Sequence, residues 1–209
     1  MVRDTISRRD FLKISFGTPA ALALGEPPEA MAHAQPLRPT PACADDAEPT
    51  PRQTAGPFFK PDSPGRTSLL EPGIRGTKIV LTGLVLSTDC KPVARALVDF
   101  WHADDRGDYD NAGYKLRGHQ LTDDHGRYRL ETIVPGLYPG RTRHFHVRVQ
   151  APSRPVLTTQ LYFPGEPQNQ RDFIFNQELV MKLQDAADGK VATFDFALDL
   201  TGRGRSRRG

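Results

Sequence analysis

The chain has 209 residues, of which 28 are lysine or arginine and 25 are aspartate or glutamate, so its formal net charge is +3. Four of the arginines lie in the last eight residues, 202–209, and without them the net charge would be about −1. The excess positive charge therefore belongs to a short basic tail, which we expect to be disordered, and it gives no support to a nucleic-acid-binding protein.

The first 34 residues have the layout of an export signal. A twin-arginine motif, Ser7-Arg-Arg-Asp-Phe-Leu-Lys13, precedes a weakly apolar run, and Ala32-His-Ala34 offers a small-x-small cleavage site. The alternative is an amphipathic N-terminal helix. The apolar run is too short and too rich in Gly and Pro to span a bilayer. We predict a signal peptide over 1–34, the twin-arginine export machinery as a partner, and a periplasmic or extracellular location.

Residues 35–77 are predicted to form an extended N-terminal arm, since the segment begins with many Pro, Ala, Asp and Thr residues. The aromatic pair Phe58 and Phe59 is expected to pack against the body of the protein. Cys43 and Cys90 are the two cysteines of the chain. Two cysteines in an exported protein favour a disulfide, and this one would pin the arm to the core.

From residue 78 the sequence turns to short strands separated by turn signals. Alternating or β-branched apolar residues predict strands at 78–86, 96–102, 126–132, 144–150, 158–163 and 194–200. Residues 173–186 hint weakly at a helix. We predict an all-β domain over 78–201, an antiparallel β-sandwich of immunoglobulin or prealbumin-like type with long active-site loops and little helix. The loop 104–120 is long and polar and carries Tyr109, so it is a candidate carrier of function.

Two histidines, His144 and His146, lie at i and i+2 in a predicted strand, so both imidazoles point to one face and can reach one metal ion. Tyr138 lies six residues before the first histidine, across a Pro/Gly turn, and Tyr109 lies in the long loop. A phenolate is a hard anion with an ordinary pKa near 10, so a strong Lewis acid is needed to keep it deprotonated at neutral pH.

Other ligand sets remain open on the residues alone. The spacing of the histidines also fits zinc or copper, and a carboxylate could complete a ferrous site with two histidines. The candidate carboxylates are Asp104, Asp105 and Asp108. Tyr114, in the same loop, is a rival to Tyr109. His102, His119 and His125 are expected to face solvent.

Four motifs in order make the chain resemble the intradiol ring-cleavage dioxygenases, the family of the catechol and protocatechuate dioxygenases. They are Trp101-x-Ala-Asp-x-x-Gly-x-Tyr109, Thr122-Asp-x-x-Gly-x-Tyr128, Thr132-Ile-x-Pro-Gly-x-Tyr138-Pro and Arg141-x-x-His144-x-His146. Gly56-Pro-Phe-Phe59 and Thr158-Thr-Gln-Leu-Tyr-Phe163 match as well. The resemblance covers roughly residues 50 to 200.

The resemblance implies a non-haem Fe(III) enzyme that cleaves a catechol between its two hydroxyls with O2 and yields a muconate-type diacid. Tyr109 and Tyr138 would be the equatorial and axial tyrosinates, and His144 and His146 the axial and equatorial histidines. Tyr138 would also act as an internal base. Arg141 would stabilise negative charge on the substrate ring, a role for which Arg143 is a nearby rival.

Gln160 matches a glutamine of the family that lies behind the metal ligands; otherwise it is a strand residue bonded to the backbone. Gly140 stands where protocatechuate enzymes have a tryptophan, and Phe59 stands where many relatives have tyrosine. These departures leave the substrate open between catechol, protocatechuate, hydroxyquinol and lignin-derived catechols, and the oligomeric state is open too. A second hypothesis is an exported β-sandwich that binds a metal or ligand without turnover.

Overall fold

The structure is a computed structural model that describes residues 47–201. The predicted signal peptide 1–34, Cys43 and the basic tail 202–209 lie outside the described residues. Cys90 takes part in a disulfide. No helix of the described part is long and apolar enough to cross a membrane.

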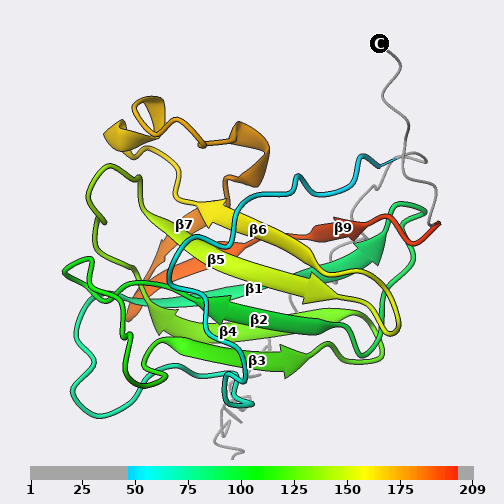
Figure 1. Cartoon of the computed structure of the whole chain (residues 1–209), viewed down its shortest axis with the longest axis horizontal. Coiled ribbons are helices and arrows are strands. Elements are labelled where there is room, and N and C mark those ends of the chain that lie inside the picture. Colours follow the sequence, from blue (N-terminus) through cyan, green and yellow to red (C-terminus); the bar gives the residue numbers. More distant parts are fainter. Residues whose placement is uncertain (1–46, 202–209) are drawn as a thin grey trace, which may run out of the picture. The chain divides into compact units, whose positions relative to one another are not determined.

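Two β-sheets form the described domain, and Figure 1 shows them as layers, one behind the other. The first sheet has the order β4-β1-β8-β7, with β9 also paired to β1, and the second has the order β3-β2-β5-β6. The strands are β1 (Lys78–Ser87), β2 (Leu97–Trp101), β3 (Arg117–Leu121), β4 (Arg127–Ile133), β5 (His144–Gln150), β6 (Leu157–Tyr162), β7 (Lys182–Ala186), β8 (Gly189–Thr193) and β9 (Phe196–Leu198). Two short 3-10 helices, η1 (Pro167–Gln170) and η2 (Gln177–Leu179), are the helical elements of the described residues. The predicted β-sandwich with little helix is confirmed.

Alternation of side chains along the strands builds the core between the two sheets. In β5, Phe145, Val147 and Val149 are all fully buried in the hydrophobic core cluster. His144 and His146 alternate with them and therefore lie on the opposite, outer face of the four-stranded sheet. The site is thus built on a rigid strand whose inner face is fixed by the core.

The pairing register brings several polar and aromatic side chains onto that outer face. His146 pairs with Trp101 of β2 on one side and with Gln160 of β6 on the other. His144 pairs with Tyr162 of β6. Because directly opposed residues share a face, these five side chains form one continuous surface.

The N-terminal arm covers this surface. The backbone N–H of Gln53 donates to the Thr158 carbonyl at 2.8 Å, and Figure 1 shows the cyan segment crossing β6 and β5. Phe59 packs edge-on against Trp101, with ring centroids 5.1 Å apart, and the Arg148 guanidinium lies 3.4 Å from the centre of the Phe59 ring. Packing of the aromatic pair on the body is therefore confirmed for Phe59, and Phe58 packs within the site described below.

The observed elements differ from the sequence-based expectations in four places. The predicted loop 104–120 ends earlier, because β3 begins at Arg117. The weakly predicted helix 173–186 consists instead of η2 and β7, joined by a short extended segment. Strand β8 was not predicted, since it buries only Ala192 and has no apolar alternation. The last predicted strand is shortened to β9, Phe196–Leu198.

Candidate metal centre

The imidazoles of His144 and His146 converge. Their Nε2 atoms are 3.1 Å apart, and the two residues are only 4% and 2% exposed. The Nδ1 of His144 lies 2.6 Å from the Thr142 carbonyl. A carbonyl can only accept, so Nδ1 carries the proton and Nε2 presents a lone pair. Trp101 stacks in parallel on His146, with ring centroids 4.9 Å apart, and fixes the plane of its ring.

Burial keeps both imidazoles neutral. It lowers the pKa of His144 to about 4 and lowers the pKa of His146 well below its ordinary value. The Arg141 charge acts in the same direction on both rings. A neutral imidazole is the form that binds a metal ion, so the histidines are ready to act as ligands at neutral pH.

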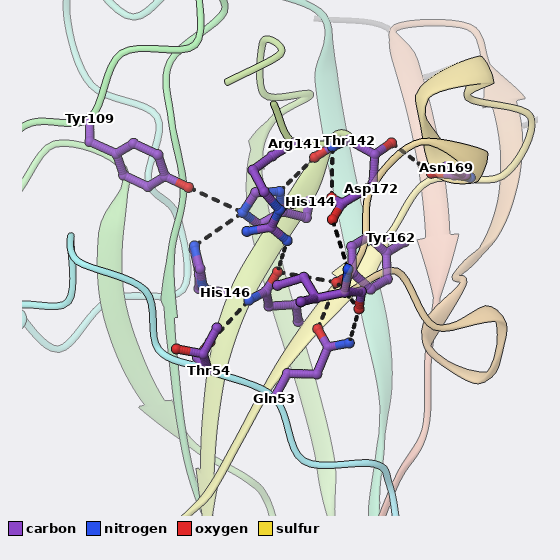
Figure 2. A network of polar contacts seen from close by, with 12 residues as sticks. Gln53, Thr54, Tyr109, Arg141, Thr142, His144, His146, Tyr162, Asn169 and Asp172 are labelled. Carbon is purple, nitrogen blue, oxygen red and sulfur yellow. Dashed lines mark hydrogen bonds and ion pairs between the residues drawn. The ribbon is translucent and has the colours of Figure 1, made fainter. Parts of the chain in front are cut away.

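Tyr109 brings a phenol to the same point. Its hydroxyl is 3.4 Å from Nε2 of His144, as Figure 2 shows. Burial raises the pKa of this phenol above its ordinary value, although the charges of Arg141 and Arg117 oppose the shift. Without a strongly charged cation beside it, Tyr109 therefore stays protonated at neutral pH.

Tyr138 joins the cluster through ring contacts. Its ring lies edge-on to that of Tyr109, with centroids 5.9 Å apart. Phe58 of the arm contacts both phenols: it stacks on Tyr109 at 4.3 Å and meets Tyr138 edge-on at 5.4 Å. The arm thus sets the positions of the two rings relative to each other.

A close backbone approach holds the two tyrosine loops together. The Gly136 N–H donates to the Asp104 carbonyl at 2.6 Å. Gly107 has φ +94°, and a Cβ there would lie 2.2 Å from the Leu137 carbonyl oxygen. Only glycine fits such a contact, which explains the glycine two residues before Tyr109 in the motif.

The donor set fits a single metal ion. Two donors at a typical metal–imidazole distance of about 2.1 Å, set about 90° apart, lie roughly 3 Å from each other. The separations of 3.1 Å and 3.4 Å among the two imidazoles and the Tyr109 hydroxyl match this spacing. Phenol donors favour a trivalent ion, so Fe(III) suits the site chemically.

The carboxylate alternative is not supported by the geometry. Among the described residues, no three or more His, Cys, Asp or Glu side chains come together as a metal site. Asp104 is occupied locally, since its Oδ1 accepts from the backbone N–H groups of Arg106 and Asp108 at 2.9 and 3.0 Å. The Tyr114 hydroxyl is engaged elsewhere, because it donates to the Pro61 carbonyl and not to the histidines.

Arg141, rather than Arg143, bonds to the residues around the histidines (Figure 2). Its Nη2 donates to Oε1 of Gln160 at 2.6 Å, and its Nε donates to Oδ2 of Asp172 at 2.8 Å. Arg143 instead pairs with Glu166 at 2.8 Å and donates to the Pro135 carbonyl. The predicted role of Arg141 in the site therefore has a structural basis that its rival lacks.

Gln160 is fully engaged by the protein. Its Oε1 accepts from Arg141, and its Nε2 donates to the Thr54 carbonyl at 3.0 Å. Both predictions for Gln160 are therefore met, since it bonds to the backbone of the arm and also holds Arg141 behind the metal ligands. The Gln160 amide therefore contributes to the site by positioning the Arg141 guanidinium.

Three residues that no sequence motif indicated as part of the site complete this network: Gln53, Tyr162 and Asp172. The Tyr162 hydroxyl donates to Oε1 of Gln53 at 2.6 Å, and burial raises the pKa of this phenol to about 12. Asp172 accepts from Arg141 and from the Thr142 N–H. The only available signal for Tyr162 was its alternation with Gln160 on one strand face.

His102 is a further correction, because it does not face solvent as expected. It is 1% exposed, its Nε2 lies 2.7 Å from Oγ1 of Thr132, and its Nδ1 lies 2.8 Å from the Ala103 carbonyl. The expectation holds for His125, which is exposed, and His119 is half-buried. His102 follows β2 and Thr132 lies on β4, so their contact joins the two sheets.

Comparison with known proteins decides the family. The family model described as "Dioxygenase" (Dioxygenase_C) matches residues 56–202. The chain belongs to this dioxygenase family. The family predicted from the motifs is therefore confirmed, and the matched segment contains every predicted site residue.

Individual relatives of this dioxygenase-family chain agree. A solved structure, the dioxygenase domain of a dioxygenase carbohydrate-binding protein fusion from the cellulolytic bacterium Streptomyces sp. SirexAA-E, is 55% identical with a TM-score of 0.71. That match covers 73% of this chain and 99% of that one. A catechol 1,2-dioxygenase 2 from Acinetobacter lwoffii is 32% identical over 60% of this chain and 55% of its own length. A protocatechuate 3,4-dioxygenase beta chain from Burkholderia cepacia is 33% identical over 61% and 66%. The chain thus spans less than two thirds of the length of these two curated relatives.

Proposed function

We propose that this protein is a non-haem Fe(III) dioxygenase that cleaves a catechol-type ring between its two hydroxyls with O2 and releases a cis,cis-muconate-type diacid. The observation that carries the proposal is the convergence of three donors on one point, since Nε2 of the buried His144 lies 3.1 Å from Nε2 of the buried His146 and 3.4 Å from the Tyr109 hydroxyl. Family membership and the 55% identity to a dioxygenase domain support it.

Each predicted ligand has a distinct part in the proposed site. His144 and His146 contribute neutral nitrogen donors, and Tyr109 and Tyr138 contribute phenolates. Bound Fe(III) would supply the Lewis acid that keeps the phenols deprotonated and makes a bound catechol reactive toward O2. Tyr138 is less enclosed than the histidines, and its phenolate oxygen is the proposed acceptor for a proton from a substrate hydroxyl.

Arg141 and the arm together favour negative charge on the substrate ring. The Arg141 guanidinium is held beside the histidines by Gln160 and Asp172, where it stabilises negative charge that develops on the substrate ring. Phe58 packs on both tyrosines and the arm covers the outer face of the sheet, so water is largely excluded from this side. A low-dielectric surrounding strengthens the effect of the guanidinium.

We also propose that the protein reaches its place of action by export through the twin-arginine machinery. The support is the motif Ser7–Lys13 followed by an apolar run and Ala32-His-Ala34. This route carries folded chains, so iron could be bound before export. Fractionation of cells that express the full chain, beside a variant with both Arg8 and Arg9 changed to Lys, tests this point. Equal amounts of both proteins outside the cytoplasm would contradict it.

The first test of function is the visible absorption spectrum of the purified protein, before and after addition of catechol without O2. We expect a broad tyrosinate-to-iron charge-transfer band that shifts to the red with catechol. Admission of O2 should then consume the catechol and release a muconate with uptake of both oxygen atoms, as measured by mass spectrometry with labelled O2.

Two outcomes would overturn the proposal. A protein that stays colourless after iron loading would have no ferric two-tyrosine site. A coloured protein that binds catechol but leaves it intact in O2 would be a binding module without turnover. A panel of catechol, protocatechuate and hydroxyquinol, compared by kcat/KM, then defines the substrate.

A further inference from the structure

Asp172 lies in the connection between η1 and η2, far from every predicted ligand in the sequence. Its side chain is fully buried, with 0% exposure. One oxygen, Oδ2, accepts from the Arg141 Nε at 2.8 Å and from the Thr142 backbone N–H at 2.9 Å. The other oxygen, Oδ1, accepts from the Ile174 N–H at 3.1 Å. Both carboxylate oxygens are thus engaged with defined donors.

The contacts of Asp172 lead to the metal site along two paths. Through Arg141 it fixes the Nε of the guanidinium, whose Nη2 is held by Gln160. Through Thr142 it fixes the peptide segment that enters β5, where the Thr142 carbonyl accepts from the Nδ1–H of His144. One carboxylate therefore sets the position of both the cation and a proposed ligand, as Figure 2 shows.

Stability alone does not explain such a pair. Removing a carboxylate and a guanidinium from water costs about as much as their attraction returns, so a buried ion pair contributes little net stability. What the pair does provide is direction, since Arg141 keeps 13% of its side chain exposed while its Nε is fixed from behind. Asn169 adds to the same support by accepting from the Thr142 hydroxyl at 2.6 Å.

We infer that Asp172 is a positioning residue for ring cleavage, which aims the Arg141 guanidinium at the substrate and holds the Thr142–His144 segment in place. This inference rests on the proposed function. Asp172 touches neither substrate nor metal in this role, and it acts through Arg141 and Thr142.

The test compares Asp172→Asn with wild type and with a matched control, Glu166→Gln. Glu166 lies directly before η1 and makes an Arg–carboxylate pair of the same length, but with Arg143. We expect Asp172→Asn to keep its iron and its charge-transfer band, to lose about 10- to 100-fold in kcat, and to change KM by less than about 3-fold. Glu166→Gln should match wild type in all of these measurements.

The double variant Arg141→Lys/Asp172→Asn separates positioning from a general structural role. An asparagine oxygen can still accept from the Thr142 N–H, so Asp172→Asn tests mainly the path through Arg141. Adding Asp172→Asn to Arg141→Lys should therefore cost far less in kcat than it does in wild type. Asp172→Glu restores the charge, so it should recover part of the lost kcat, and it also serves if the asparagine variant does not fold.

The failure of this inference can be told apart from failure of the proposed function. A wild-type protein that does not cleave catechols would overturn the function itself. Active wild type with an equally active Asp172→Asn, or losses that simply multiply in the double variant, would overturn the role of Asp172 alone.

Discussion

The protonation state of Tyr109 depends on whether a metal ion occupies the site. Its phenol is buried beside neutral imidazoles, and burial raises its pKa above the ordinary value. The protein alone therefore favours the protonated phenol, and an ion in the site must supply the energy that ionises it. Colour and turnover should depend together on the two tyrosines of the site.

Replacement of Tyr109 or Tyr138 by Phe should weaken and shift the charge-transfer band and lower kcat by more than about 100-fold, because loss of a ligand should exceed the 10- to 100-fold cost of losing a residue behind one. Tyr114→Phe is the control, since that phenol is exposed and bonds to the Pro61 carbonyl. Iron content, the visible spectrum and kcat are measured for all three variants. A Tyr138→Phe variant with full colour and turnover would remove Tyr138 from the ligand set.

The arm is the element whose role the sequence indicates least. Its expected packing through Phe59 is found, yet its close approach to the metal site becomes visible only in three dimensions. Gly56 has φ +66°, and a Cβ there would lie 3.2 Å from Cε1 of His146 and 3.6 Å from its Nε2. The absence of a side chain at this position lets the arm lie directly over the proposed ligand.

Gly56→Ala should therefore disturb the metal site as well as the fold. The left-handed backbone alone costs an alanine about 1–2 kcal/mol, and Gly165→Ala is a control for that strain, since Gly165 has φ +72° and open space around it. Both variants should unfold at lower denaturant concentration. Only Gly56→Ala should also lose iron affinity and alter the charge-transfer band. Equal iron binding by the two variants would contradict the close approach of the arm to His146.

Strands with an apolar, alternating face were predictable, and strands without one were not. β1 and β5 bury their apolar residues in the core, and their limits were predicted to within one residue. β3 contains Arg, Gly, His and Gln, and the arm rather than alternation accounts for the burial of its polar Arg117, whose Nη1 donates to the Phe58 carbonyl at 2.7 Å. β7 is an edge strand with mostly exposed residues, and β8 lies between β1 and β7 but buries only Ala192, so no hydrophobic period marks either strand.

The same distinction applies to the site at the scale of the whole molecule. Tyr109, Tyr138, His144 and His146 lie in short motifs of fixed spacing, so sequence alone could propose them as a set. Asp172 and Gln53 are 31 and 88 residues from Arg141 in the chain, and they meet its network only because a loop and the arm fold over one sheet face. No local spacing encodes such contacts.

The contact between the two sheets at His102 makes stability depend on pH. Burial lowers the pKa of His102 from 6.5 to about 4. Between these values the unfolded chain binds a proton that the folded chain does not, so stability falls as the pH falls. The contribution is fully present above pH 6.5 and is lost by about pH 4. The difference in pKa corresponds to about 3 kcal/mol.

We therefore expect the free energy of unfolding of iron-loaded wild type to fall more steeply between pH 6.5 and 4 than that of His102→Gln, since glutamine does not titrate and can still bond to Thr132. The advantage of wild type at pH 7 should shrink by about 3 kcal/mol at pH 4. His125→Gln, at an exposed position, should follow wild type, which removes the general effect of losing a histidine. Urea unfolding at a series of pH values measures the three curves. Parallel curves for wild type and His102→Gln would mean that His102 is protonated in the folded protein, so the sheets would then be joined by a charged imidazole donating to Thr132.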